Sequence, residues 1–223
     1  MRHYRSVSIA LTISALMMTV LLSGCLGRSG LDNTELTFSL PTTLSITRGA
    51  SLLNTGISYE SASDDAVWLN IGGRRALKRM GDSVSWKGSL FAGTNAELAL
   101  RLVHIGEDKV DLAGTARITV HDVSPEAGGL VTTAPVTFSG PVAYGVAVDS
   151  YIPGTTLAYL GPAEEGAELS GLGNEYPYRR MGDSVIWEGR LRPGVYLRTE
   201  LRTVQYDSKG LRLAGIATLW FGE

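Results

Sequence analysis

Lys78–Leu90 reads Lys-Arg-Met-Gly-Asp-Ser-Val-Ser-Trp-Lys-Gly-Ser-Leu, and Arg179–Leu191 reads Arg-Arg-Met-Gly-Asp-Ser-Val-Ile-Trp-Glu-Gly-Arg-Leu. Nine of the thirteen positions are identical, and the two stretches are 101 residues apart. A long stretch that returns at a fixed offset indicates that one supersecondary unit is built twice. The chain is therefore expected to contain two copies of one fold.

The similarity between the copies extends well beyond this stretch. Leu36-Thr-Phe-Ser-Leu-Pro41 matches Val136-Thr-Phe-Ser-Gly-Pro141 at an offset of 100. We therefore place repeat 1 at residues 36–121 and repeat 2 at residues 136–223. Residues 122–135 between them are rich in Pro, Gly and Thr, which is typical of a linker.

Each copy reads as a series of strands. The clearest is residues 109–120, in which apolar or small residues occupy every second position: Val110, Leu112, Gly114, Ala116, Ile118 and Val120. Strict alternation over this length predicts a half-buried strand. The mid-strand Gly114 recurs as Gly215 and predicts a bulge or the close approach of another backbone. After residue 25 no run at helical spacing is found, so the folded part is predicted to be all-β.

The expected architecture is two tandem immunoglobulin-like antiparallel β-sandwich repeats. The alternative is one integrated sandwich or barrel built from the two repeats. The linker of 14 residues fits either arrangement.

The duplicated stretch itself predicts a hairpin. Gly81-Asp82 between two strand-like runs is typical of a two-residue type II′ turn. Val84 and Trp86 would then face the core, and Ser85 and Lys87 would face outward. We expect the Arg79 guanidinium to lie over the Trp86 indole. Turn and packing rules favour a structural role for this stretch over a ligand-binding loop.

The N-terminus carries a targeting pattern. Arg2 and Arg5 precede an apolar run over residues 9–22, which is short for a membrane span of about 20 residues. The run ends in Leu22-Ser-Gly-Cys25, which resembles the lipobox of bacterial lipoproteins, and Cys25 is the single cysteine of the chain.

This resemblance covers residues 1–25 and implies an address rather than an activity. It implies that residues 1–24 are a cleaved signal peptide and that Cys25 carries a diacylglyceride and an N-acyl chain such as palmitate. Residues 25–35 would be the lipidated cysteine and a tether. Because Leu26 rather than Asp follows the cysteine, the family's sorting rule implies the outer rather than the inner membrane. The folded part is expected to face the periplasm, with the cell surface as the alternative.

Composition and motifs argue against several function classes. A net charge of −2 and the absence of a basic run give no footprint for nucleic acid. The histidines are His3, His104 and His121, and none belongs to a catalytic motif or a metal-spaced cluster. The sequence therefore predicts a protein that is not an enzyme and has neither a cofactor nor a metal.

Aromatic residues present in one copy only are the candidate binding residues. Trp68 aligns with Leu169, Trp220 with Thr119, and Tyr176 with Arg75. Trp68 and Trp220 also break the alternation of their strands. Such residues are expected either to bind a sugar or a protein at the surface, or to bury against the other repeat or the linker.

Three functions stay open from the sequence. The leading prediction is a non-catalytic outer-membrane lipoprotein that scaffolds or assists an envelope assembly through protein contacts. The first alternative is a carbohydrate- or peptidoglycan-binding module, which an aromatic strip with polar ligands on one face would favour. The second is an inhibitor of an envelope-directed hydrolase, which a long protruding loop at residues 60–65 or 161–173 would favour.

Overall fold

The computed structural model describes residues 34–63, 65–129 and 133–222. Cys25, the signal peptide and most of the tether therefore lie outside the described residues. Among the described residues there is no helix with the length and apolar character that a membrane crossing needs. The regular elements are all strands, so the all-β prediction is confirmed.

Repeat 1 contributes eight strands: β1 (Glu35–Thr47), β2 (Ser51–Leu52), β3 (Ile57–Ala62), β4 (Ala66–Ile71), β5 (Arg74–Arg79), β6 (Ser83–Phe91), β7 (Thr94–Ile105) and β8 (Lys109–His121). β9 (Glu126–Ala127) lies in the linker. Repeat 2 contributes the rest: β10 (Val136–Val146), β11 (Ser150–Tyr151), β12 (Ala158–Pro162), β13 (Ala167–Ser170), β14 (Tyr178–Arg179), β15 (Ser184–Arg192), β16 (Val195–Asp207) and β17 (Gly210–Phe221).

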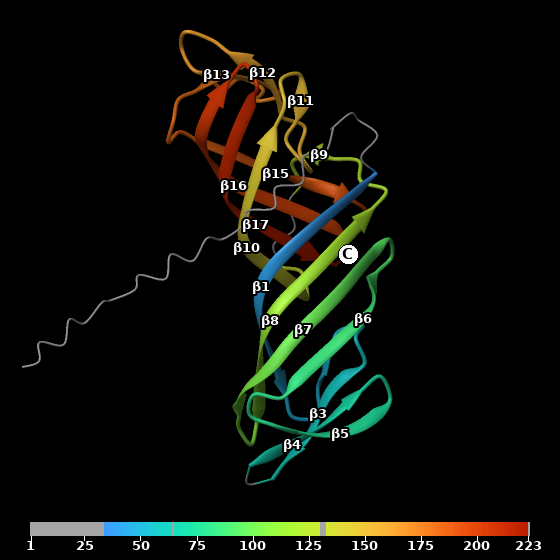
Figure 1. The fold of residues 1–223 in the computed structure, drawn as a ribbon. Helices are drawn as coiled ribbons and strands as arrows, with labels where there is room; N and C mark the ends of the chain where they lie inside the picture. The colour runs from blue at the N-terminus through green and yellow to red at the C-terminus, as the bar shows by residue number, and fades with distance from the viewer. Residues whose placement is uncertain (1–33, 64, 130–132, 223) are drawn as a thin grey trace, which may run out of the picture.

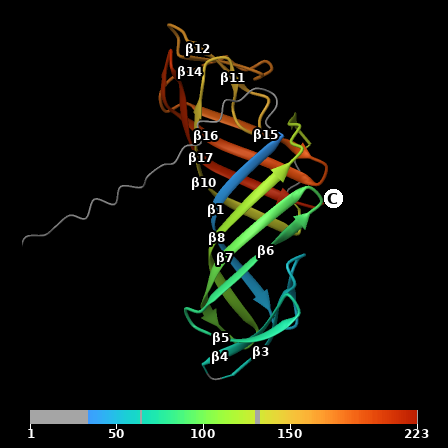
Figure 2. The ribbon, with the colours of Figure 1, turned by 45° about the vertical axis from the view of Figure 1, so that its right-hand side comes forward.

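Each repeat forms one large and one small antiparallel sheet. Large sheet 1 has the order β1-β8-β7-β6, and large sheet 2 has the order β10-β17-β16-β15-β9. Small sheet 1 is β2-β3-β4-β5, and small sheet 2 is β11-β12-β13-β14. The large sheets cross each other in the middle of the molecule, and the small sheets lie at its two ends (Figures 1 and 2).

The two repeats share one core. A single cluster of buried apolar side chains runs through both large sheets. Phe91 of repeat 1 stacks on Phe221 of repeat 2 with ring centroids 5.6 Å apart. At the crossing of β1 and β10, a Cβ built on Gly140 would lie 3.3 Å from the Cβ of Leu40. This sharing of a core corresponds to the integrated alternative.

The contacts between the repeats obey an approximate twofold symmetry. Leu40 and Gly140, which meet at the crossing, hold equivalent positions in the two copies. Phe91 corresponds to Arg192, and Arg192 donates from Nη1 to the backbone oxygen of His121, 2.7 Å away. His121 lies one residue beyond Val120, which is the counterpart of Phe221. Such reciprocal pairing is the geometry of an isologous interface.

The immunoglobulin-like detail is not confirmed. An immunoglobulin sandwich interleaves its strands between sheets, in the orders A-B-E-D and C-F-G. Here each small sheet joins four strands consecutive in the chain, and each large sheet pairs the first strand of its repeat with the last. The bounds 36–121 and 136–223 stay predictions. The predicted linker contributes a strand, β9, to large sheet 2.

The alternation predicted for residues 109–120 is confirmed by β8, whose inward residues Val110, Leu112, Ala116, Ile118 and Val120 are buried. Gly114 sits among them where the backbone of β7 approaches closely. A Cβ on Gly114 would lie 2.1 Å from the carbonyl oxygen of Ala99, and one on Gly215 would lie 2.0 Å from that of Glu200. The prediction of a close backbone approach is therefore confirmed in both copies.

The predicted hairpin is wrong. β5 pairs with β4 and β6 pairs with β7, so Gly81-Asp82 joins two different sheets. The Asp82 N–H donates to the carbonyl oxygen of Arg79, 3.0 Å away, and Gly81 has φ +85°. Gly81 is thus the third residue of a type II turn, the position that needs positive φ. The predicted faces of β6 hold, with Val84 buried and Ser85 and Lys87 exposed.

Candidate binding surfaces

The duplicated stretch builds one corner in each repeat, where the chain passes from the small sheet to the large sheet. In repeat 1 the N–H of Gly81 donates to Leu102 (2.8 Å), and the N–H of Leu102 donates to Asp82 (3.0 Å). Arg101 Nη1 adds a bond to the carbonyl oxygen of Gly81 (2.9 Å). The Asp82 carboxylate accepts the Arg79 N–H (2.9 Å). The corner is therefore fixed to β7 and closed upon itself.

Repeat 2 reproduces these bonds. Gly182 has φ +87°, and its N–H donates to Thr203 at 2.8 Å. Arg202 Nη1 donates to the carbonyl oxygen of Gly182 at 2.8 Å, and Asp183 accepts the Arg180 N–H at 2.7 Å. Glycine, aspartate and arginine thus have the same structural roles in both copies.

The methionine of the duplicated stretch has no such role. Met80 is 57% exposed and Met181 is 70% exposed. Next to each corner, on the strand to which it is bonded, lies a valine: Val103 is 45% exposed and Val204 is 49% exposed. These are the two equivalent pairs among the large apolar side chains exposed in the described residues. We call Met80, Val103 and Arg101, with Met181, Val204 and Arg202, the two corner surfaces.

Cations surround both corner surfaces. Lys78 Nζ donates to the Ser83 carbonyl (2.8 Å), and its counterpart Arg179 donates from Nε to the Ser184 carbonyl (3.0 Å). Arg79 reaches Asp65 at 3.2 Å, and both side chains are largely exposed. Arg179 is also paired with Glu175 at 2.7 Å, and its side chain is only 11% exposed, so acidic residues of the same chain offset two of these three cations.

Trp68 is covered by a cation of the neighbouring strand. It lies on β4, half-buried, and the Arg75 guanidinium lies over its ring at 4.2 Å from the centroid. Arg75 also bonds Glu60 at 2.7 Å. The predicted stacking of Arg79 on Trp86 is wrong, because Arg79 turns outward to Asp65. The cation that covers an indole here is Arg75.

Trp220 lies in a row of side chains across the outward face of large sheet 2. β-Sheet register places Trp220 beside Tyr196, Tyr196 beside Arg190, and Arg190 beside Glu126 of the linker strand. Arg190 and Glu126 form an ion pair at 2.7 Å. A shallow depression of about 240 Å³ borders Tyr196, Arg190 and residues 126–129. We call these four side chains the aromatic row.

Tyr196 was missed from the sequence. Its counterpart in repeat 1 is Asn95, so the rule that selected Trp220 would also have selected Tyr196. Tyr176 lies far from the aromatic row in the fold, in the loop before β14. It is 63% exposed and packs edge-to-face on Tyr178 with centroids 5.3 Å apart. Trp68, Trp220 and Tyr176 therefore belong to three separate places and form no common site.

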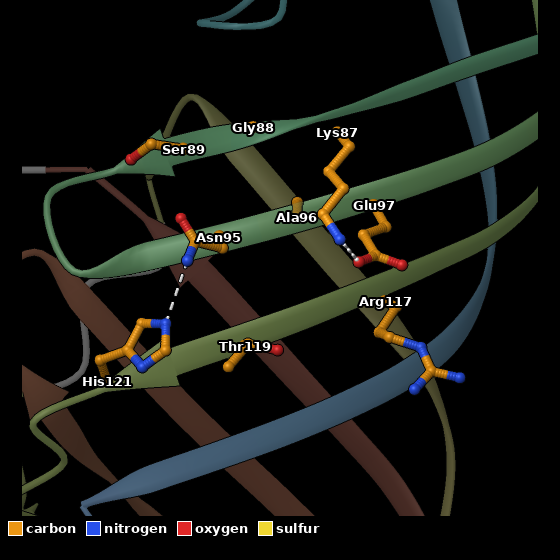
Figure 3. Close-up of a pocket in the computed structure, with 9 residues that line it drawn as sticks. All are labelled: Lys87, Gly88, Ser89, Asn95, Ala96, Glu97, Arg117, Thr119 and His121. Atoms are coloured by element: carbon orange, nitrogen blue, oxygen red, sulfur yellow. Dashed lines mark hydrogen bonds and ion pairs between the residues drawn. The ribbon is translucent and has the colours of Figure 1, made fainter.

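The outward face of large sheet 1 is polar where large sheet 2 is aromatic. Figure 3 shows the polar side chains on this face of large sheet 1. Thr119, Asn95 and Ser89 hold the positions of Trp220, Tyr196 and Arg190. Beside them Lys87 bonds Glu97, and this bond lowers the pKa of the Glu97 carboxyl. These residues line a shallow depression of about 390 Å³. We call Thr119, Asn95 and Ser89 the polar row.

His121 at the end of the polar row has both ring nitrogens engaged. Nε2 lies 3.1 Å from the Asn95 amide nitrogen, and Nδ1 lies 3.0 Å from the Glu35 carboxylate. No group of three or more His, Cys, Asp and Glu side chains suited to a metal occurs in the part of the chain that the structure describes.

Comparison with known proteins gives no further assignment. No family model matches the chain, and neither the curated proteins nor the solved structures compared with it gave a match.

Proposed function

We propose that this chain is a non-catalytic lipoprotein of the bacterial outer membrane, anchored at Cys25 and facing the periplasm, that holds an envelope assembly together through protein contacts. The observation that carries the proposal is the pair of corner surfaces. Met80 and Met181 are exposed, identical in the two copies and unneeded by the turn that presents them. A feature kept in both copies without a role in the fold is best explained by a partner.

The contrast with another shared pair supports this interpretation. Tyr59 and Tyr159 are also equivalent, and both are fully buried. Tyr59 donates to the Gly106 carbonyl at 2.8 Å, and Tyr159 donates to the Asp207 carbonyl at 2.9 Å. Each hydroxyl bonds its small sheet to the turn between the last two strands of its large sheet. The fold itself therefore explains why both copies keep the tyrosine. It gives no such explanation for the methionines.

Site-specific crosslinking tests the corner surfaces. A photoreactive amino acid is placed at position 80 or 181 of the full-length lipidated protein and activated in intact cells. Both positions should yield an adduct of the same mass, because the two corners present the same groups. The matched control is position 160, an exposed leucine that repeat 1 lacks. Adducts with unrelated proteins at positions 80 and 181, or none at either, would contradict the proposal.

The anchor has its own test. Cys25→Ser removes the thiol that accepts the lipid, so an unlipidated, uncleaved precursor is expected. Metabolic labelling with palmitate and membrane fractionation measure this outcome directly. A Cys25→Ser protein that is still processed and still found in the outer membrane would refute the lipoprotein assignment.

A second candidate function is binding of a carbohydrate or peptidoglycan strand by the aromatic row. It is favoured by one observation: Trp220 and Tyr196 lie side by side on adjacent strands, next to the Arg190–Glu126 pair. An apolar platform with convergent polar groups suits a sugar ring. Trp220→Ser should abolish binding of soluble peptidoglycan fragments in calorimetric titration, whereas Trp68→Ser should leave it unchanged. Equal binding by both variants would exclude this site.

The inhibitor alternative has no such support. β3 extends to Ala62, and β12 and β13 occupy most of the segment from Gly161 to Ser170. The connection between β12 and β13, residues 163–166, is short, and backbone hydrogen bonds join Ala163 and Gly166. It is therefore not the long protruding loop that an inhibitor would need.

A further inference from the structure

The edge of large sheet 2 is covered by a strand from the linker. β9 runs beside β15, with Gly189 opposite Ala127 and Arg190 opposite Glu126. Backbone bonds run from Gly128 N–H to the Glu188 oxygen (2.9 Å) and from Ser124 N–H to the Leu191 oxygen (2.8 Å). The approach is so close that a Cβ on Gly189 would lie 2.2 Å from the Glu126 oxygen.

The equivalent edge of large sheet 1 is open. In the described part of the chain β6 pairs with β7 alone, and it is the outermost strand of its sheet (Figure 1). Main-chain groups of successive residues point to alternate sides of a strand. Because Glu188 bonds toward β9, its counterpart Lys87 points its N–H and C=O away from β7, and so do Ser85 and Ser89.

Both ends of this open edge are closed by side chains. Lys78 Nζ donates to the Ser83 oxygen at 2.8 Å, and Asn54 Nδ2 donates to the Leu90 oxygen at 2.7 Å. The open part is therefore limited to the middle of β6. Three residues there offer three donors and three acceptors, which is enough for a short added strand.

The tryptophans beside the two edges differ accordingly. Trp187, beside the covered edge, is 4% exposed, and its Nε1 donates to Thr156 Oγ1 at 3.0 Å. Trp86, in the same position beside the open edge, is only partly buried. A strand along β6 would lie beside Trp86, as β9 lies beside Trp187.

Charge selects the occupant. Lys87, Glu97 and Arg117 form a row of alternating sign across large sheet 1, and Lys87 is its last member at the edge. In large sheet 2 the covering strand also sets a carboxylate against an edge cation, Glu126 against Arg190, two residues along the strand from the position equivalent to Lys87. A carboxylate is therefore the fitting neighbour for Lys87. A second copy of this chain fits poorly, because antiparallel pairing of β6 about its middle brings two Lys87 side chains together, and like charges directly opposite are destabilising.

We propose that the open edge of β6 accepts a β-strand of a partner protein that carries an acidic residue opposite Lys87. Main-chain bonds to Ser85, Lys87 and Ser89 supply the affinity, and the carboxylate sets the register. The edge is separate from both corner surfaces, so this inference does not depend on the proposed function.

The test uses the full-length protein and two synthetic nine-residue peptides of alternating valine and threonine, one with aspartate and one with lysine at the centre. Hydrogen exchange is followed residue by residue. The aspartate peptide should slow exchange at Ser85, Lys87 and Ser89 by roughly tenfold or more, since their N–H groups become bonded. Exchange at Val84 and Trp86, already bonded to β7, should change little. The lysine peptide should bind at least about tenfold more weakly.

Ser85→Pro gives the matched variant. Proline on an edge strand removes an outward N–H without touching the bonds to β7, so the protein should fold. The Ser85→Pro protein should no longer bind the aspartate peptide, whereas the Ser85→Ala protein should bind it as the parent does. If Ser85→Pro does not fold, Lys87→Glu serves instead and should reverse the preference between the peptides.

Three outcomes would overturn the inference: no change in exchange at Ser85, Lys87 and Ser89 with the aspartate peptide, equal binding of the two peptides, or a homodimer that Ser85→Pro dissociates. The last would make a second copy the occupant. Met80→Ser with Met181→Ser should leave peptide binding unchanged, which separates this edge from the corner surfaces.

Discussion

Large sheets 1 and 2 have the same frame but different edges and different outward faces. The edge of β15 is covered by the linker and that of β6 is open. Trp220 and Tyr196 stand where large sheet 1 has Thr119 and Asn95. The interiors of the two sheets are alike, and both contain a mid-strand glycine, Gly114 or Gly215, against which the neighbouring backbone packs closely. The fold dictates what the two copies share internally, so their surface features need an explanation of their own.

The largest expected difference concerns the two tryptophans of the duplicated stretch. Trp187→Ala should cost about 3–5 kcal/mol of unfolding free energy, because a buried indole and its bond to Thr156 are lost. Trp86→Ala should cost less, about 1.5–3 kcal/mol, because Trp86 is only partly buried. Urea denaturation of both variants measures the difference. Equal losses of unfolding free energy would mean that the open edge does not reduce the contribution of Trp86 to stability.

The mid-strand glycines should behave alike. Gly114→Ala and Gly215→Ala would each push a methyl group to about 2 Å from a carbonyl oxygen of the neighbouring strand. The strands must separate, which should cost about 1–3 kcal/mol in either copy. Thermal melting is sufficient to measure it. If only one of the two variants were destabilised, the strand packing around the two glycines would be less similar than their geometry implies.

Tyr59 and Tyr159 test the attachment of the small sheets. Tyr59→Phe and Tyr159→Phe each remove a hydroxyl that donates to the backbone of a hairpin, and each should cost about 0.5–1.5 kcal/mol. Met80→Ser and Met181→Ser, measured beside them, should stay within about 0.5 kcal/mol of the parent. A methionine variant that destabilises as much as its tyrosine counterpart would assign the methionine to the fold.

The smallest effect is the pH dependence that Asp111 of repeat 1 adds to the stability of the fold. The Ser45 hydroxyl donates to Asp111 at 2.5 Å, and this bond, together with Lys109, lowers the pKa of the carboxyl below its ordinary value of 3.8. A lowered pKa stabilises the fold above the unfolded value, and this stability is lost as the pH falls through the folded value. The counterpart in repeat 2 is Arg212. Asp111→Asn should weaken the loss of stability below about pH 4, as followed by urea denaturation. The part contributed by Glu97 and Asp207, whose carboxyl pKa values are also lowered, should stay.

Much of the local structure could be predicted from the sequence. The alternation of residues 109–120 identifies β8 and its buried face, because a period of two has no other explanation. The outward positions of β6 could be identified because Ser85 and Lys87 differ from their counterparts while the buried positions agree. Gly114 and Gly215 indicated a close backbone approach, because a residue with a side chain would not fit there in either copy.

The corner and the shared core could not be predicted. Gly with positive φ suits the second residue of a type II′ hairpin turn and the third residue of a type II turn equally, so Met-Gly-Asp does not distinguish a hairpin from a corner between sheets. An inward side chain such as Phe91 has the same pattern whether its own repeat or the other one covers it. Tyr196, by contrast, could have been identified, because like Trp220 it is an aromatic residue on an outward position that the other copy lacks.

Calorimetric unfolding of a matched pair tests the shared core most directly. Leu112 and Leu213 are equivalent and buried, one in each repeat. If the repeats form one body, the parent protein unfolds in a single transition, and Leu112→Ala and Leu213→Ala each lower that transition as a whole. Two transitions, of which each variant lowers only one, would contradict the account and show two independent sandwiches.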